Sequence, residues 1–238
     1  MALSTDYSRN FFDLSSASGE QRAACHADFT RACAAALRRQ NARPDRIEAC
    51  TNELWQRMSE PHRHYHTPVH VLSMFSWADR LGMVLSDAQT LAIWCHDVIW
   101  ESDAEDDRNE QRSADWLIAE ARTLELDEAV ASEAAEAIRW TATHLTPEVP
   151  AAVAPVLDLD LAGFASEASV FRTQSAAVRK EMGHFDDAAF AAGTVKFFHA
   201  LLARDRLYRT EAAQVLEAPA RAALTQEVHR LSQQLPSA

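Results

Sequence analysis

The sequence contains little glycine and no long hydrophobic run. Only 5 of its 238 residues are glycine, whereas alanine is abundant, and this composition favours helices over a fold rich in β-turns. No apolar run is long enough to cross a bilayer, and residues 1–10 lack the apolar core of a signal peptide. We therefore expect a cytoplasmic protein without a membrane partner.

The chain is also poor in positive charge. Its 23 Lys and Arg residues face 35 Asp and Glu residues, which gives a formal net charge of −12. Without a clear basic patch, a nucleic-acid polymer is not expected as a partner. A small phosphorylated compound is compatible with this charge, because a metal ion and a few cationic side chains set the local potential.

The four cysteines show no CxxC spacing, which argues against a redox or zinc motif of that type. Cys25, Cys33 and Cys95 lie in apolar or alanine-rich helical patterns. We therefore expect them to be reduced and buried.

Helical patterning dominates the rest of the chain. Hydrophobic residues make up 47% and charged residues 24%, as in an ordinary globular protein. The pattern predicts an all-α, single-domain helical bundle over residues 1–238. Its expected parts are a packing layer (18–58), a core that carries the site (61–208) and C-terminal helices (209–235).

Histidines are concentrated in one short segment. Four of the ten lie within residues 62–70, and a His-Asp pair, His96-Asp97, follows 26 positions after His70. Thr67-Pro68 is a helix-start signal, so His66 is expected just before a helix and His70 in its first turn. Imidazole nitrogens and carboxylate oxygens suit a divalent zinc, manganese, iron or nickel ion.

The His-Asp pair is expected in a buried helix. The capping-box pattern Ser86-x-x-Gln89 predicts the start of this helix, and apolar residues surround it almost completely up to Ile99. A buried carboxylate needs a cation close by, and the nearby histidines favour a metal ion over an ion pair. Adjacent helical residues project about 100° apart, so His96 and Asp97 need another segment to complete the shell of one ion.

These motifs resemble the HD superfamily of metal-dependent phosphohydrolases. The H…HD…D order of that family is matched by Arg63-x-x-His66, by His96-Asp97 and by a later aspartate. A bacterial branch known mainly as predicted hydrolases is similar in three elements, Arg63-His64-Tyr65-His66-x3-His70, Ala92-x3-His96-Asp97 and Asn109-Glu110-x2-Ser113-Ala114. The resemblance covers residues 54–208 and implies an HD-type helical domain with a divalent ion (Mn, Fe, Ni, Zn or Mg).

The resemblance implies four metal ligands, namely His66, His96, Asp97 and a later aspartate. Asp97 is thereby also counted as catalytic. Two aspartates compete for the last position in the sequence Asp158-Leu-Asp160. The Asp-x-Asp-Leu element of the family favours Asp160 and leaves Asp158 as the alternative.

Five further residues are candidates for the site. Arg63 is expected to offset phosphate charge through paired hydrogen bonds. Glu110 could accept a proton from the attacking water, bind a second ion or cap its helix. His70 and His144 are candidates for additional ligands or substrate contacts. Lys180 is either an anion contact or part of a solvated helix face.

The activity that the resemblance implies is hydrolysis of a phosphomonoester or phosphodiester by metal-activated water, most commonly in a nucleotide. Two alternatives stay open. One is an HD-type oxygenase with two metals, for which His70, His144 and Glu110 would supply the extra ligands. The other is a non-catalytic module that binds metal and nucleotide. The oligomeric state, a homo-oligomer included, stays open too.

Overall fold

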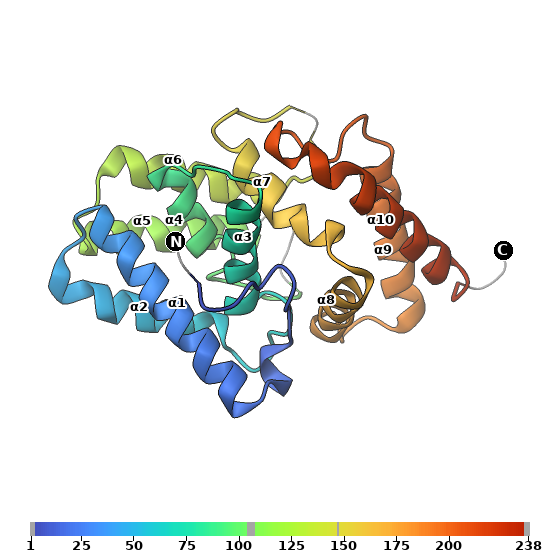
Figure 1. Cartoon of the computed structure of the whole chain (residues 1–238), viewed down its shortest axis with the longest axis horizontal. Helices are drawn as coiled ribbons and strands as arrows, with labels where there is room; N and C mark the ends of the chain where they lie inside the picture. Colours follow the sequence, from blue (N-terminus) through green and yellow to red (C-terminus); the bar gives the residue numbers. More distant parts are fainter. Residues whose placement is uncertain (1–2, 104–107, 147, 236–238) are drawn as a thin grey trace.

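The computed structural model describes residues 3–103, 108–146 and 148–235, which form ten α-helices, three short 3-10 helices and no β-strand (Figure 1). The all-α expectation is confirmed. The α-helices are α1 (Gly19–Arg39), α2 (Pro44–Met58), α3 (Pro68–Arg80), α4 (Asp87–Cys95), α5 (Arg108–Thr123), α6 (Glu128–Thr141), α7 (Ala154–Leu161), α8 (Ala168–Glu181), α9 (Asp187–Leu202) and α10 (Glu217–Ser232). The 3-10 helices are η1 (Leu14–Ser16), η2 (Ala162–Ala165) and η3 (Ala212–Leu216).

Helices α3 and α4 lie at the centre of the molecule (Figure 1). The α1–α2 pair packs on one side of them and the α5–α6 pair on the other, and α7 contacts α3, α4 and α6. Helix α10 packs against α9 and η2 at the C-terminal end. The buried side chains form one hydrophobic cluster that extends from Tyr7 to Val228. None of the described helices combines the length and apolar character needed to cross a bilayer.

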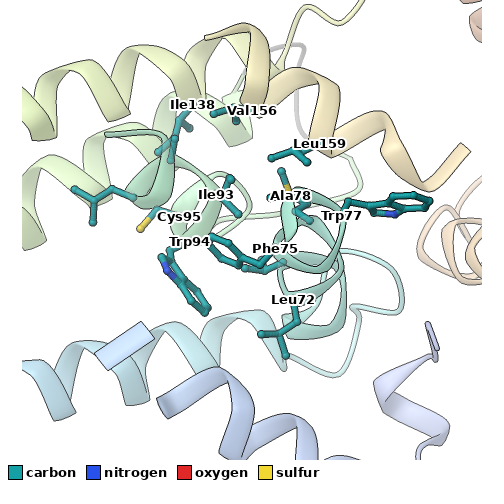
Figure 2. Close-up of a cluster of buried hydrophobic side chains, with 14 of the residues drawn as sticks. Leu72, Phe75, Trp77, Ala78, Ile93, Trp94, Cys95, Ile138, Val156 and Leu159 are labelled. Carbon is teal, nitrogen blue, oxygen red and sulfur yellow. The ribbon is translucent and has the colours of Figure 1, made fainter. Parts of the chain in front are cut away.

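Aromatic side chains fill the space between the central helices (Figure 2). The indole of Trp94 on α4 lies 4.7 Å from the ring of Phe75 on α3 and 5.0 Å from that of Phe29 on α1, centroid to centroid. Each such pair contributes about 0.5–1.5 kcal/mol beyond the burial of its area. The four cysteines are buried and free, as expected for three of them. This packing fixes α3 and α4, the two helices that lead to the histidines.

Both expected helix starts in this region are confirmed. Ser86 and Gln89 form a reciprocal capping box, with hydrogen bonds of 3.1 Å from the Gln89 amide to Ser86 Oγ and 2.9 Å from the Ser86 amide to Gln89 Oε1. Thr67 caps α3 through the amide of Val69, and Pro68 occupies the first helical position. Local sequence therefore determines where these helices begin.

Helix α4 ends earlier than its apolar pattern predicts. It stops at Cys95, so His96 is its C-cap and Asp97 lies in the following turn. The side chain of Arg63 explains this end, because it donates to the carbonyl oxygens of Asp97 (2.6 Å) and Val98 (3.1 Å). A longer helix would need these carbonyls for its own hydrogen bonds. The expectation that both site residues are helical is therefore wrong.

Candidate metal centre

Four side chains from three parts of the chain converge beside α3. His70 comes from the first turn of α3, His96 and Asp97 from the end of α4, and Asp160 from α7. His70 Nε2 lies 2.9 Å from Asp160 Oδ1 and 3.3 Å from His96 Nε2. His96 Nε2 lies 2.9 Å from Asp97 Oδ2. We call these four residues the His-Asp cluster; in it, one ligand atom each of His70, His96 and Asp97 lie within 4.8 Å of one another.

The orientation of His96 leaves one nitrogen available. Its Nδ1 lies 3.0 Å from the carbonyl oxygen of Ile93, and because a carbonyl only accepts, Nδ1 carries the proton. Nε2 therefore points into the cluster as a potential ligand. Asp97 Oδ2 is buried there, and its closest ion pair among the described residues is with His96 Nε2. A buried carboxylate oxygen in that situation fits a cation.

The charges in the cluster are strongly coupled. Burial alone would lower the pKa of His96, but the carboxylates of Asp97 and then Asp160 raise it to about 9. Burial would likewise raise the pKa of Asp160, but hydrogen bonds from His144 and His70 hold it well below its usual value. Without a metal, the imidazolium of His96 offsets part of the negative charge of the carboxylates, and a divalent ion would supply positive charge in its place.

Two further groups flank the cluster. His144, which follows α6, places Nε2 3.0 Å from Asp160 Oδ2, and its buried Nδ1 has no partner in the described part of the chain. Glu110 lies in the first turn of α5. Burial raises its pKa, and the charges of Asp97 and Asp160 raise it further. The structure therefore brings His144 into contact with the cluster, and Glu110 into the electrostatic field of its carboxylates.

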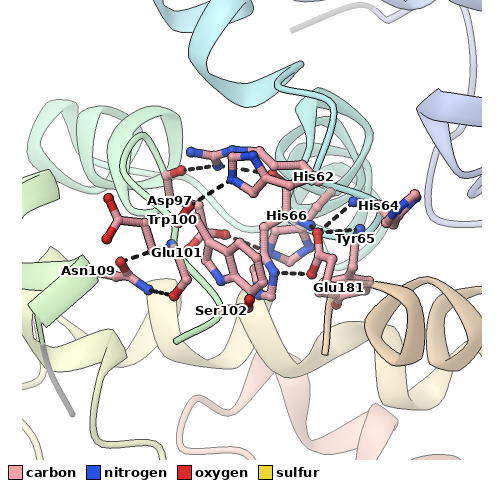
Figure 3. Close-up of polar contacts among 12 residues, drawn as sticks. His62, His64, Tyr65, His66, Asp97, Trp100, Glu101, Ser102, Asn109 and Glu181 are labelled. Carbon is pink, nitrogen blue, oxygen red and sulfur yellow. Dashed lines mark hydrogen bonds and ion pairs between the residues drawn. The ribbon is translucent and has the colours of Figure 1, made fainter. Parts of the chain in front are cut away.

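His66 lies outside this group of four. Its Nδ1 is 2.6 Å from Glu181 Oε2, and its ring stacks on Trp100 with a centroid distance of 4.6 Å (Figure 3). No hydrogen bond or ion pair in the described ranges joins it to the cluster. The ring of His66 also lies 6.1 Å from that of His70, centroid to centroid, so His66 adjoins the group of four, and its role as a ligand stays a prediction. His66 precedes α3, whereas His70, one turn later, bonds to Asp160 on α7.

Glu181, the last residue of α8, is the site residue that the sequence did not reveal. Its Oε1 accepts hydrogen bonds from three consecutive backbone amides, those of His64 (2.7 Å), Tyr65 (2.7 Å) and His66 (2.9 Å). Its carboxylate thereby clamps the histidine segment (Figure 3). The sequence candidate in this helix is the neighbouring Lys180, whereas the residue that contacts the histidine segment is Glu181.

Arg63 has a structural task instead of the expected phosphate contact. Its side chain is fully buried. Nε donates to Glu60 Oε2 (3.1 Å), Nη1 to the carbonyls of His66 (3.1 Å) and Asp97 (2.6 Å), and Nη2 to that of Val98 (3.1 Å). A guanidinium engaged in this way has no free edge for a phosphate. Arg63 therefore joins the histidine segment to the His-Asp turn.

The two remaining candidates also have partners elsewhere. Lys180 is half exposed, and its Nζ pairs with Asp13 Oδ2 at 2.7 Å. Asp158 accepts the backbone amides of Arg209 (2.8 Å) and Thr210 (2.7 Å) and the hydroxyl of Thr210 (2.7 Å). Between the two aspartates that the sequence left open, only Asp160 lies in the cluster.

The donor set defines what the cluster can hold. Two imidazole nitrogens and two carboxylate oxygens suit manganese, iron, nickel or zinc, whereas magnesium prefers oxygen ligands throughout. Metal binding by these residues stays a prediction. Among known proteins, no family model, curated protein or solved structure matches the chain. The function is therefore inferred from the geometry of this site and from the sequence motifs.

Proposed function

We propose that the chain is a metal-dependent phosphohydrolase that acts on a small phosphorylated compound of the nucleotide class. One observation carries the proposal: imidazole nitrogens of His70 and His96 and carboxylates of Asp97 and Asp160 meet at hydrogen-bonding distances in a largely buried site. These four residues would hold one divalent ion. When bound, such an ion supplies Lewis-acid polarisation of a phosphoryl oxygen and of a water molecule.

The cluster is open only on its carboxylate side. The side chains of Asp97 and Asp160 are each 14% exposed, whereas those of His70 and His96 are 2% and 1% exposed. A phosphoryl group at the end of a small molecule fits such an opening better than a polymer backbone does. We therefore propose a small-molecule phosphate substrate. The proposed location is the cytoplasm, as the composition favours.

Two residues beside the cluster are suited to proton transfer. The raised pKa of Glu110 brings this carboxylate closer to the neutral range, where it can accept a proton from the attacking water. The second residue is His66, whose Nδ1 bonds to the carboxylate of Glu181. Burial would lower the pKa of His66, but the charge of Glu181 raises it. A protonated His66 would donate its Nε2 proton to the leaving-group oxygen.

A second candidate function follows from the same neighbours. His144 contacts Asp160, and the charges of Asp97 and Asp160 act on Glu110, so His144 and Glu110 are the candidate ligands of a second ion, as a two-metal oxygenase requires. A non-catalytic module that binds metal and nucleotide would use the same residues without turnover. The number of ions per chain distinguishes the two-metal oxygenase from the proposed phosphohydrolase. A turnover assay distinguishes the non-catalytic module from the proposed phosphohydrolase.

Metal content tests the proposal directly. Protein purified without chelator is expected to carry about one transition-metal ion per chain by mass spectrometry, and His96→Ala is expected to lose it. His199→Ala is the matched control, because His199 is exposed on α9. Two ions together with oxygen-dependent turnover would support the oxygenase. Folded, metal-free protein that takes up no added divalent ion would refute the metal centre.

The role of His66 predicts a dependence on the leaving group. Loss of general acid catalysis costs about 100-fold or more where the leaving oxygen needs a proton. We expect His66→Gln to lower kcat on phenyl phosphate by about 100-fold and on 4-nitrophenyl phosphate, which leaves without a proton, by less than about 10-fold. His62→Gln is the control, since the ring of His62 lies farther from that of Trp100 (6.2 Å, centroid to centroid) and its Nε2 is engaged by the carbonyl oxygen of Trp100 at 3.1 Å. Equal losses on both esters with loss of the metal would identify His66 as a ligand instead.

A further inference from the structure

The aromatic ring of Phe185 is exposed, and its segment is linked to the His-Asp cluster region by a series of side-chain contacts. Among the described residues, four large hydrophobic side chains are exposed, Val84, Leu145, Phe185 and Val215, and Phe185 is the aromatic one, with 47% of its surface accessible. It lies in the connection between α8 and α9, four residues after Glu181. A single exposed hydrophobic side chain is ordinary by itself, so the contacts that link this ring to the candidate site carry the argument.

Two chain segments connect this ring to the site. Both segments start at a residue that contacts His66. One follows Glu181, whose carboxylate binds Nδ1 of His66, and the other follows Trp100, on which the His66 ring stacks. The segments meet again farther out, where Ser102 Oγ lies 3.4 Å from His184 Nδ1. The position of Ser102 beside the site is visible in Figure 3. Phe185, next to His184, therefore lies at the outer end of a series of contacts that begins at His66.

Hydrogen bonds from Arg179 hold the backbone beside this ring, whereas the ring itself is partly exposed to solvent. Arg179 donates from Nη1 to the carbonyl of Met182 (3.0 Å) and from Nη2 to that of Phe185 (3.1 Å). The rings of His184 and Phe185 lie 4.2 Å apart, centroid to centroid, and are tilted by 43°. The partly exposed ring of Phe185 is therefore the face on which a planar group can stack, with the ring of His184 beside it.

We infer that His184 and Phe185 form a stacking platform for the aromatic base of the substrate, while its phosphate lies at the His-Asp cluster. The substrate class is then a nucleotide with its base outside and its phosphate inside. The hydroxyl of Ser102 and the imidazole of His184 are the polar groups next to such a base. This inference rests on the proposed function for the phosphate end only, because the platform itself recognises a ring.

Equilibrium binding tests the platform without turnover. We expect the wild-type protein to bind AMP more tightly than ribose 5-phosphate in isothermal titration calorimetry, because only AMP carries a base. Stacking on an aromatic side chain accounts for about a 10-fold difference in Kd. Phe185→Ala should weaken AMP binding by about that factor and leave ribose 5-phosphate unchanged. Val215→Ala, which removes an exposed side chain on η3, is the matched control and should change neither.

Other outcomes would overturn the platform. Equal affinity of the wild type for both ligands, an undiminished AMP affinity in Phe185→Ala, or an equal loss for both ligands would each do so. The proposed function fails in a different experiment, namely when wild-type protein loaded with metal hydrolyses no phosphate ester. Base-dependent binding that requires Phe185 would support the platform even then.

Discussion

Replacing Asp160 with asparagine is expected to lower kcat/KM for phosphate-ester hydrolysis by at least about 1,000-fold, because loss of a ligand should exceed the 10–100-fold cost of losing an outer hydrogen-bond partner. Asp160 contacts His70 through Oδ1 (2.9 Å) and His144 through Oδ2 (3.0 Å). The amide keeps the size of the side chain but removes its charge and one acceptor. Metal content and kinetics of the same preparation measure the effect.

The neighbouring aspartate supplies the control for this variant. Asp158→Ala should keep about one ion per folded chain, because its carboxylate points to residues 209–210. If Asp160→Asn keeps its metal and its activity while Asp158→Ala loses both, the assignment of the last ligand is reversed. If neither variant affects the metal, the ion does not bind at α7.

Asp158→Ala is instead expected to lower the free energy of unfolding by roughly 3 kcal/mol or more, since it leaves three donors unpaired at about 1–3 kcal/mol each. The donors are the amides of Arg209 and Thr210 and the hydroxyl of Thr210, and the carboxylate that binds them is buried. They fix the segment between α9 and η3. Urea unfolding followed by circular dichroism measures the change.

A surface aspartate on α5 provides the reference for this stability loss. Asp115 is 64% exposed and pairs with Arg139 at 3.5 Å. Asp115→Ala should change the unfolding free energy by less than about 0.5 kcal/mol. A similarly small effect of Asp158→Ala would mean that the segment around Thr210 is held by other contacts.

Local features of the fold could be predicted from the sequence. The starts of α3 and α4 depend on side chains within three residues, Thr67-Pro68 in one case and Ser86 with Gln89 in the other. Such interactions need no knowledge of the rest of the molecule. The early end of α4 could not be predicted, because the group that captures its carbonyls, Arg63, is more than 30 residues away in the chain.

The candidate site shows the same division. The sequence indicated which residue types would gather, and the structure brings His96, Asp97 and Asp160 together. The sequence named His66 as a ligand and His70 as an additional candidate, but not which of the two would bond to Asp160. That choice depends on Glu181, which binds three amides of the segment and draws His66 to itself. A carboxylate 115 residues away leaves no periodic pattern near the histidines.

The contacts of Arg63 have a consequence for how the protein would acquire its metal. One guanidinium holds both the histidine segment, through the carbonyl of His66, and the turn after α4, through those of Asp97 and Val98. The proposed ligands would therefore be assembled before an ion arrives, and little conformational entropy would be lost on its binding. Such a site differs from a small zinc domain that folds around its ion. Removal of the ion should accordingly abolish activity and leave the helical fold in place.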